Sequence, residues 1–150
     1  MPQTKSYNNA LLIPDIVQLV REGRSVVLTV NGRSMRPFIE NGRDQVTLTG
    51  AEDVKVGDVV LADTLEKGYV IHRLVGINNN ICVIQGDGNL DKEHCSFDKI
   101  LAKVSVITRK SKHVRTDGAL WRWYSFFWTR TLPLRRYMLA FYRIFPIKHN

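Results

Sequence analysis

The sequence predicts a mainly β protein: a coiled antiparallel sheet or partly open barrel of about six short strands, with a short N-terminal helix and an amphipathic helical C-terminal segment. Three observations predict this fold class. Short runs rich in β-branched residues follow one another between residues 25 and 108, turn signals separate them, and no long helical segment intervenes. Such runs pair most simply as an antiparallel sheet that curls on itself.

Length and composition limit the class of protein. The chain has 150 residues, 44% of them apolar and 24% charged, which fits one globular domain rather than a disordered or uniformly membranous chain. Two cysteines, Cys82 and Cys95, are too few for a disulfide-stapled secreted scaffold, and without a C-x-x-C pair a zinc ribbon is excluded. The low cysteine content makes a reduced compartment the simpler expectation. No secretory signal is visible in the first fourteen residues.

A short amphipathic helix is predicted ahead of the strands. Pro14 suits a first helical turn and Gly23 a C-terminal cap. One helical face is marked by apolar residues at the spacing i, i+3, i+4 and i+7, namely Ile13, Ile16, Val17 and Val20.

The predicted strands share β-branched composition and partial alternation. They lie at residues 25–30, 45–49, 58–63, 69–77, 81–85 and 100–108. The turns between them carry glycine, asparagine or aspartate, at Asn41-Gly42, Gly57-Asp58, Lys67-Gly68, Asn78-Asn79-Asn80 and Gly86-Asp87-Gly88-Asn89. Together with the helix they make up the predicted N-terminal β unit, residues 1–108.

The net charge of +8 belongs to the C-terminal third. Residues 1–98 contain ten Lys and Arg against thirteen Asp and Glu, whereas residues 99–150 contain twelve against one. An anionic partner is therefore expected at the C-terminal end. Residues 109–118 are polar and basic and are predicted to be a linker, and residues 119–150 form an aromatic, arginine-rich segment.

The stretch 119–147 contains all three tryptophans and five arginines but no acid, and Pro133 divides it. A membrane-spanning helix would be costly, because each arginine costs roughly 2.5 to 3.5 kcal/mol at the bilayer centre. An in-plane helix at an anionic membrane surface costs less, since arginine reaches the headgroups and Trp and Tyr prefer the interface. The alternative is that these aromatic residues pack on the sheet as ordinary core.

The loop at residues 31–39, NGRSMRPFI, is the most informative stretch for function. It directly follows a predicted strand, and a glycine and a proline bend it around one serine, Ser34. Met35 is expected to anchor the loop in the core. The alternative is an ordinary turn hydroxyl that bonds its own backbone.

His72 stands in the middle of the apolar predicted strand at 69–77. Alternation puts His72 and Arg73 on opposite faces, so one of the two polar groups points to a buried side and needs a partner. A neutral imidazole can accept the proton of a nearby serine hydroxyl, and a carboxylate on its other nitrogen fixes the tautomer. The alternative is a half-exposed structural histidine.

After the predicted strand at 81–85 comes a glycine turn with two carboxylates four residues apart, Asp87 and Asp91. Asp87, Asn89 and Asp91 alternate as in calcium loops. A calcium loop also needs a glycine directly after Asp91 and a glutamate at its twelfth position, and both are missing. No metal and no cofactor is expected.

Four motifs occur in one order: the loop G-x-S-M-x-P, then VKVGDVV, then YVIHRLVGI, then QGDGN followed by an aspartate. In this order they resemble the signal peptidase I superfamily over about residues 31–108. The histidine before arginine is most similar to the branch typified by the endoplasmic-reticulum and archaeal enzymes, because the bacterial type has a lysine base at the position of His72.

The resemblance implies a serine endopeptidase with Ser34 as nucleophile and His72 as general base. Asp91 is the nearest match to the family's acidic residue, and Asp87 is its competitor. Gly32 stands where many members have a hydroxyl residue that stabilises the oxyanion, which leaves backbone N–H groups such as that of Ser34. Members usually begin with a transmembrane anchor, and here the C-terminal segment is expected to take over that task.

We therefore expect a serine endopeptidase that removes a leader or signal peptide from a peptide or precursor protein. It is expected to be cytoplasmic and in peripheral contact with the anionic inner face of the membrane. The alternative is a non-catalytic β-domain that its basic tail recruits to anionic membrane or nucleic acid. Nucleic acid is the less expected partner, because residues 1–30 leave room for one short helix and not for a helix-turn-helix.

Overall fold

The computed structural model describes residues 9–144, and statements about residues 1–8 and 145–150 fall outside this range. The helices are α1 (Asn9–Arg21), α2 (Ala119–Arg130) and α3 (Leu132–Ile144), with a 3-10 turn η1 (Phe97–Lys99). The strands are β1 (Val26–Thr29), β2 (Gln45–Thr49), β3 (Val59–Thr64), β4 (Gly68–Asn78), β5 (Ile81–Gln85), β6 (Glu93–Ser96), β7 (Ile100–Arg109) and β8 (Lys112–Arg115).

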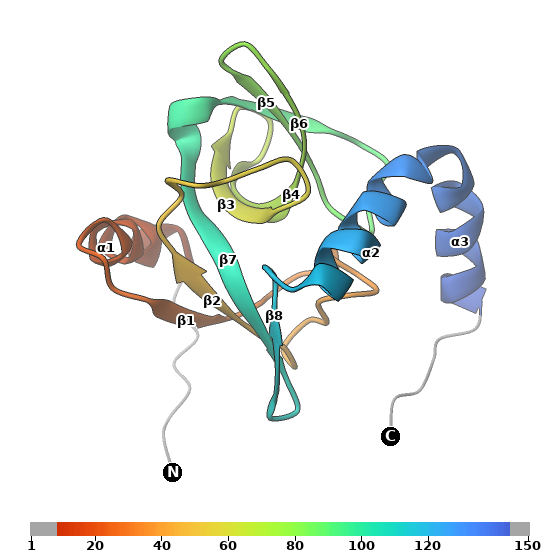
Figure 1. Ribbon diagram of the computed structural model, residues 1–150, viewed down its shortest axis with the longest axis horizontal. Helices are drawn as coiled ribbons and strands as arrows, with labels where there is room; N and C mark the ends of the chain where they lie inside the picture. The colour runs from red at the N-terminus through yellow and green to blue at the C-terminus, as the bar shows by residue number, and fades with distance from the viewer. Residues whose placement is uncertain (1–8, 145–150) are drawn as a thin grey trace.

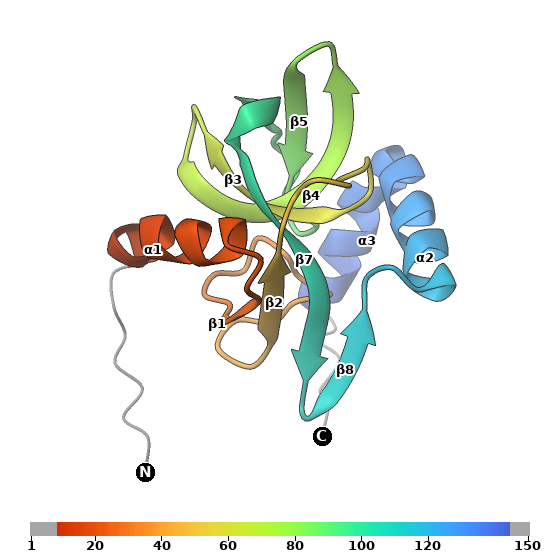
Figure 2. The same cartoon turned by 60° about the vertical axis from the view of Figure 1, so that its left-hand side comes forward.

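The strands form one antiparallel sheet in the order β1-β2-β7-β3-β4-β5-β6, with β8 paired to β7. The sheet curls into a half-barrel, with α1 at one side and the α2–α3 pair at the other (Figures 1 and 2). Register shifts interrupt the pairing of β2 with β7, of β3 with β7 and of β4 with β5. Such irregularities increase the local twist, which favours this curl, and the predicted fold class is confirmed.

All six predicted strands are present, and two further strands were not predicted. β8 falls within residues 109–118, so the prediction of a linker there is wrong. Lys110 and Ser111 have positive φ values, of 43° and 67°, and connect β7 to β8 as a two-residue turn. Positive φ at both central residues gives the backbone twist that suits a tight hairpin, and here it occurs without the usual asparagine or glycine.

α1 covers one face of the sheet with its apolar side. Gly23 has a φ of 82°, its N–H bonds the Val20 carbonyl, and the Arg24 N–H bonds the Leu19 carbonyl. These two bonds form the Schellman arrangement, which confirms the predicted cap. Pro14 lies inside the helix rather than in its first turn, because α1 begins at Asn9.

The core has two parts on the two sides of the curled sheet. The first lies between α1, the loop after β1, and strands β1, β2, β3 and β7, and includes Met35 and Ile39. The second fills the half-barrel and is formed by Val60, Ala62, Leu74, Cys82, Ile84, Cys95 and Ile100. His72 on β4 lies next to Ile71 of the first part and two residues before Leu74 of the second.

The C-terminal helices pack directly on the sheet domain. The ring of Phe38, from the loop after β1, lies 4.3 Å from the ring of Tyr124 and 5.2 Å from that of Trp128. Trp128 is 4% exposed, whereas Trp123 is 74% exposed. The alternative that the aromatic residues pack on the sheet as core therefore holds for the face of the segment with Trp128 and not for the face with Trp123. Within residues 9–144 no helix is long and apolar enough to cross a bilayer.

Candidate active site

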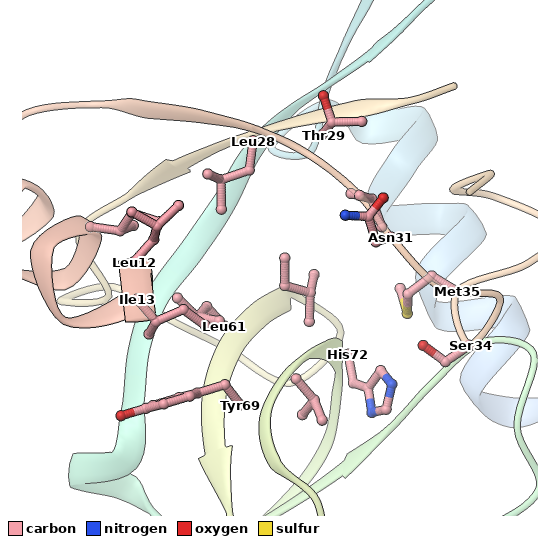
Figure 3. Close-up of a pocket in the computed structure, with 14 residues that line it drawn as sticks. Leu12, Ile13, Leu28, Thr29, Asn31, Ser34, Met35, Leu61, Tyr69 and His72 are labelled. Carbon is pink, nitrogen blue, oxygen red and sulfur yellow. The ribbon is translucent and has the colours of Figure 1, made fainter. Parts of the chain in front are cut away.

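Ser34 and His72 lie in one pocket of about 210 Å³ (Figure 3). The pocket is bounded by α1, by β1 and its following loop, and by β3 and β4. Its lining is mostly apolar, and includes Leu12, Ile13, Ile16, Leu28, Met35, Leu61, Val70 and Ile71. The Ser34 side chain and the His72 ring are neighbours at one end of this pocket (Figure 3).

The loop that carries Ser34 is fixed at both of its sides. Met35 is 2% exposed and belongs to the core, which confirms its predicted role as an anchor. The Ser34 carbonyl accepts a hydrogen bond of 2.8 Å from the Gly88 N–H. Among residues 9–144 the Ser34 hydroxyl and N–H have no bonded partner. Ser34 is therefore not the turn hydroxyl of the alternative interpretation, and its N–H is free to bind an oxyanion.

His72 is held by a buried carboxylate. Its Nδ1 lies 2.8 Å from Oε2 of Glu93, the first residue of β6, and the two residues are 3% and 1% exposed. Lys67 donates from Nζ to Oε1 of the same carboxylate at 2.6 Å. Glu93 thus accepts from both partners through different oxygens. The alternative of a half-exposed histidine does not hold, because His72 is buried and bonded.

Burial is the main influence on the charge of His72. It lowers the pKa of the imidazole below the ordinary 6.5, because a buried ring loses the hydration of its charged form, and this outweighs the opposing effect of Glu93. The positive charge of Lys67 lowers the same pKa further. At neutral pH the ring is therefore uncharged. With Nδ1–H donated to Glu93, Nε2 is left as a proton acceptor.

Gly86 separates the His72 ring from the serine loop at close range. A Cβ at this position would lie 3.1 Å from His72 Nε2 and would overlap the Ser34 carbonyl oxygen. A glycine is therefore required for Nε2 and the Ser34 loop to approach each other. No hydrogen bond joins the Ser34 hydroxyl to His72 in the described chain. Such bonds are often long in unliganded enzymes and tighten when substrate binds.

Neither of the two acids expected from the family pattern, Asp87 and Asp91, lies in the position that orients His72. Asp87 is buried and accepts two hydrogen bonds from Arg73, at 2.8 and 2.6 Å. Asp91 is exposed. Neither bonds His72, so the carboxylate that fulfils this geometric role is Glu93. The calcium alternative also loses its first ligand, because Arg73 takes both oxygens of Asp87, and residues 9–144 contain no metal-binding cluster of His, Cys, Asp or Glu.

Arg73 ties the site to the C-terminal helices. Besides Asp87, its Nη1 donates to the Gly57 carbonyl at 2.8 Å and to the Ser125 hydroxyl of α2 at 2.6 Å. Arg73 is as fully buried as His72, so both polar groups of β4 point to buried surroundings, where only one was expected.

Arg135 of α3 makes a second connection to the turn at residues 86–87. It donates from Nη2 to the Gly86 carbonyl at 2.6 Å and from Nε to the Asp87 carbonyl at 3.1 Å. Because the next residue, Gly88, bonds the Ser34 carbonyl, α3 braces the turn that supports the serine loop.

Sequence reasoning missed Glu93, Lys67 and Arg135. A signal for Glu93 exists in the short run EHCS, where Glu93 and Cys95 alternate with polar residues and pair with Ile84 and Cys82 of β5. A buried carboxylate at the start of a strand needs a cationic or hydrogen-bonding partner. His72 and Lys67 supply these from 21 and 26 residues away, and only the fold brings them together.

Comparison with known proteins gives no relationship for this chain. No family model matches it, and neither a search of curated proteins nor a search of solved structures finds a significant match.

Proposed function

We propose that the protein is a serine endopeptidase of the signal-peptidase type, with Ser34 as nucleophile, His72 as general base and Glu93 as the carboxylate that orients the base. The observation that carries the proposal is the position of Ser34 and His72 in one pocket, with His72 Nδ1 bonded to the buried Glu93. Acyl transfer of this kind requires a nucleophile, a base next to it and a group that orients the base.

The chemistry follows from these positions. His72 Nε2 takes the hydroxyl proton as Ser34 Oγ attacks the scissile carbonyl, and the oxygen of that carbonyl becomes negative. The N–H of Ser34 donates to this oxyanion, and Asn31, whose side chain lines the same pocket, is the second donor that we propose. The imidazolium then protonates the leaving amine. Water, activated by the same base, hydrolyses the acyl-enzyme ester and regenerates Ser34.

Two free strand edges beside the pocket support a peptide substrate. Among residues 9–144, β1 pairs only with β2, and residues 68–72 of β4 pair only with β3, since β5 joins β4 from Arg73 onward. Both segments contribute residues to the pocket that holds Ser34 and His72. An extended peptide can add to such edges through its backbone and insert alternate side chains into the apolar pocket. Leader and signal peptides, which contain apolar segments, fit this chemistry.

The proposal is tested by digestion of a diverse peptide library with the purified full chain, with new termini identified by mass spectrometry. Wild type is expected to cleave, and Ser34→Ala and His72→Ala to lose at least about 100-fold in rate. Ser25→Ala, which removes an exposed hydroxyl outside the pocket, is the matched control and is expected to cleave as wild type does. Absence of cleavage by wild type would favour the non-catalytic binding module instead. Unchanged cleavage by Ser34→Ala would contradict the role of Ser34 as the nucleophile.

A further inference from the structure

The outer face of the two C-terminal helices is unusually apolar for a surface. We call this face, formed by the exposed side chains of α2 and α3, the outer helix face. Its large apolar members are between 41% and 87% exposed: Leu120, Trp123, Phe126, Phe127, Leu134, Tyr137, Met138, Phe141 and Ile144. Contiguous exposed patches of this kind mark interaction sites in folded proteins.

The helical spacing places the exposed apolar residues on one side of each helix. In α3, Leu134, Met138 and Phe141 recur at intervals of four and three, which aligns them on one side of the helix. Arg135 and Leu139 lie on the other side and are buried. α2 is divided in the same way, with Ser125 and Trp128 inward and Trp123 and Phe127 outward. Each helix therefore has an inner face fixed to the sheet domain and a second, outward apolar face.

Charge indicates what covers the outer helix face. α2 and α3 contain no Asp or Glu, while four arginines beside the apolar residues are exposed: Arg122, Arg130, Arg136 and Arg143. A second copy of the chain would bring the same uncompensated positive charges together. A surface that combines negative charge with an apolar layer complements both features, and this is the chemistry of an anionic phospholipid bilayer.

We propose that the outer helix face docks α2 and α3 in the plane of an anionic bilayer, with the aromatic and aliphatic side chains at the acyl boundary and the four arginines at the headgroups. Helices of 12 and 13 residues are too short to cross a bilayer but long enough to lie in the interface. The proposal does not depend on the peptidase function, since it rests on a different face and predicts binding rather than cleavage.

Docking would carry the whole domain to the membrane. The inner faces of the same helices hold Arg73 through Ser125 and the turn at residues 86–87 through Arg135. The helices are therefore braced against the pocket domain (Figures 1 and 2), and not joined to it by a free linker.

Co-sedimentation with lipid vesicles tests the proposal on the full chain. Vesicles of equal parts phosphatidylserine and phosphatidylcholine are compared with phosphatidylcholine alone, at low and high salt. Wild type is expected to bind the anionic vesicles, and less strongly as salt screens the charges. Arg122→Gln/Arg136→Gln is expected to weaken partitioning about 25-fold, about fivefold for each arginine. The control Arg24→Gln/Lys112→Gln removes two exposed charges elsewhere and is expected to weaken it far less.

The apolar contribution is tested in the same assay. Trp123→Ser/Phe141→Ser is expected to reduce partitioning at least about tenfold, and the remaining binding should be more sensitive to salt. The control Leu65→Ser/Ile81→Ser changes two exposed apolar residues outside the outer helix face. Circular dichroism checks that each variant is folded.

Three results would overturn the proposal. The first is wild-type protein that stays in the supernatant with anionic vesicles, and the second is equal loss of binding in the face variants and their controls. The third is a wild-type oligomer in size-exclusion chromatography that Trp123→Ser/Phe141→Ser converts to a monomer, while neither protein binds vesicles. That result would assign the outer helix face to contacts between copies of the chain.

Discussion

Nδ1 of His72 on β4 lies 2.8 Å from Oε2 of Glu93 on β6, and both side chains are buried. A carboxylate in this position holds the imidazole in the tautomer whose Nε2 can accept a proton, and in the proposed reaction it would stabilise the imidazolium. Glu93 is itself bonded by Lys67 at 2.6 Å. His72 on β4, Glu93 on β6 and Lys67 in the turn between β3 and β4 thus form a bonded chain of three side chains.

Glu93→Gln is expected to lower kcat by about 100- to 10,000-fold, because an amide can hold the ring in the wrong tautomer and cannot stabilise the imidazolium. The measurement is steady-state cleavage of the best peptide from the library. Asp91→Asn is the control, since Asp91 is exposed and does not bond His72. A large loss in Asp91→Asn with an active Glu93→Gln would restore Asp91 as the orienting acid.

The pH dependence of kcat/KM is expected to rise through a group with a pKa below 6.5, because burial disfavours the protonated and inactive form of His72. Lys67→Met removes a positive charge that lowers this pKa, so the rising limb should move to higher pH. Lys112→Met, far along the chain on β8, should leave the limb in place. A limb that stays fixed or moves to lower pH in Lys67→Met would contradict the role assigned to Lys67.

Gly86→Ala is expected to reduce kcat strongly and to lower stability by about 1–3 kcal/mol, because the new methyl group would overlap the Ser34 carbonyl oxygen and crowd His72 Nε2. Thermal unfolding and cleavage assays measure the two effects. Gly76→Ala serves as the control, since a Cβ there would meet Val83 at an ordinary 3.8 Å. Wild-type activity in Gly86→Ala would show that the close approach of Ser34 and His72 is not needed.

Arg135→Gln is expected to lower both stability and kcat. The Asp87 carbonyl loses its buried donor, at a cost of about 1–3 kcal/mol, and the Gly86 carbonyl loses its charged donor but retains the bond from the Asn89 N–H. The neighbouring Arg136 is exposed, so Arg136→Gln should have the same stability as wild type and should cleave soluble peptides at the same rate. Equal behaviour of the two variants would show that α3 does not brace the site. By the same reasoning, truncation after Gly118 is expected to impair the site rather than leave it intact.

Local sequence pattern predicts much of the fold. Alternating β-branched runs and glycine turns predict six of the strands, and the loop around Ser34 and the strand around His72 are distinctive in the sequence alone. Glu93 was not recognised, because β6 has only four residues and mixed polarity and is stabilised by pairing with β5. The roles of Asp87 and Arg135 depend on contacts with Arg73 and with the 86–87 turn, which are 14 and 48–49 residues away in the sequence.

Covalent labelling with a fluorophosphonate, followed by tandem mass spectrometry, tests most directly whether Ser34 is a nucleophile activated by His72. We expect a single phosphonyl adduct on Ser34 of the wild-type protein, with labelling slowed at least about 100-fold in His72→Ala and absent in Ser34→Ala. Wild-type protein that is not labelled, an adduct on another residue, or labelling of Ser34 at the same rate in His72→Ala would contradict it.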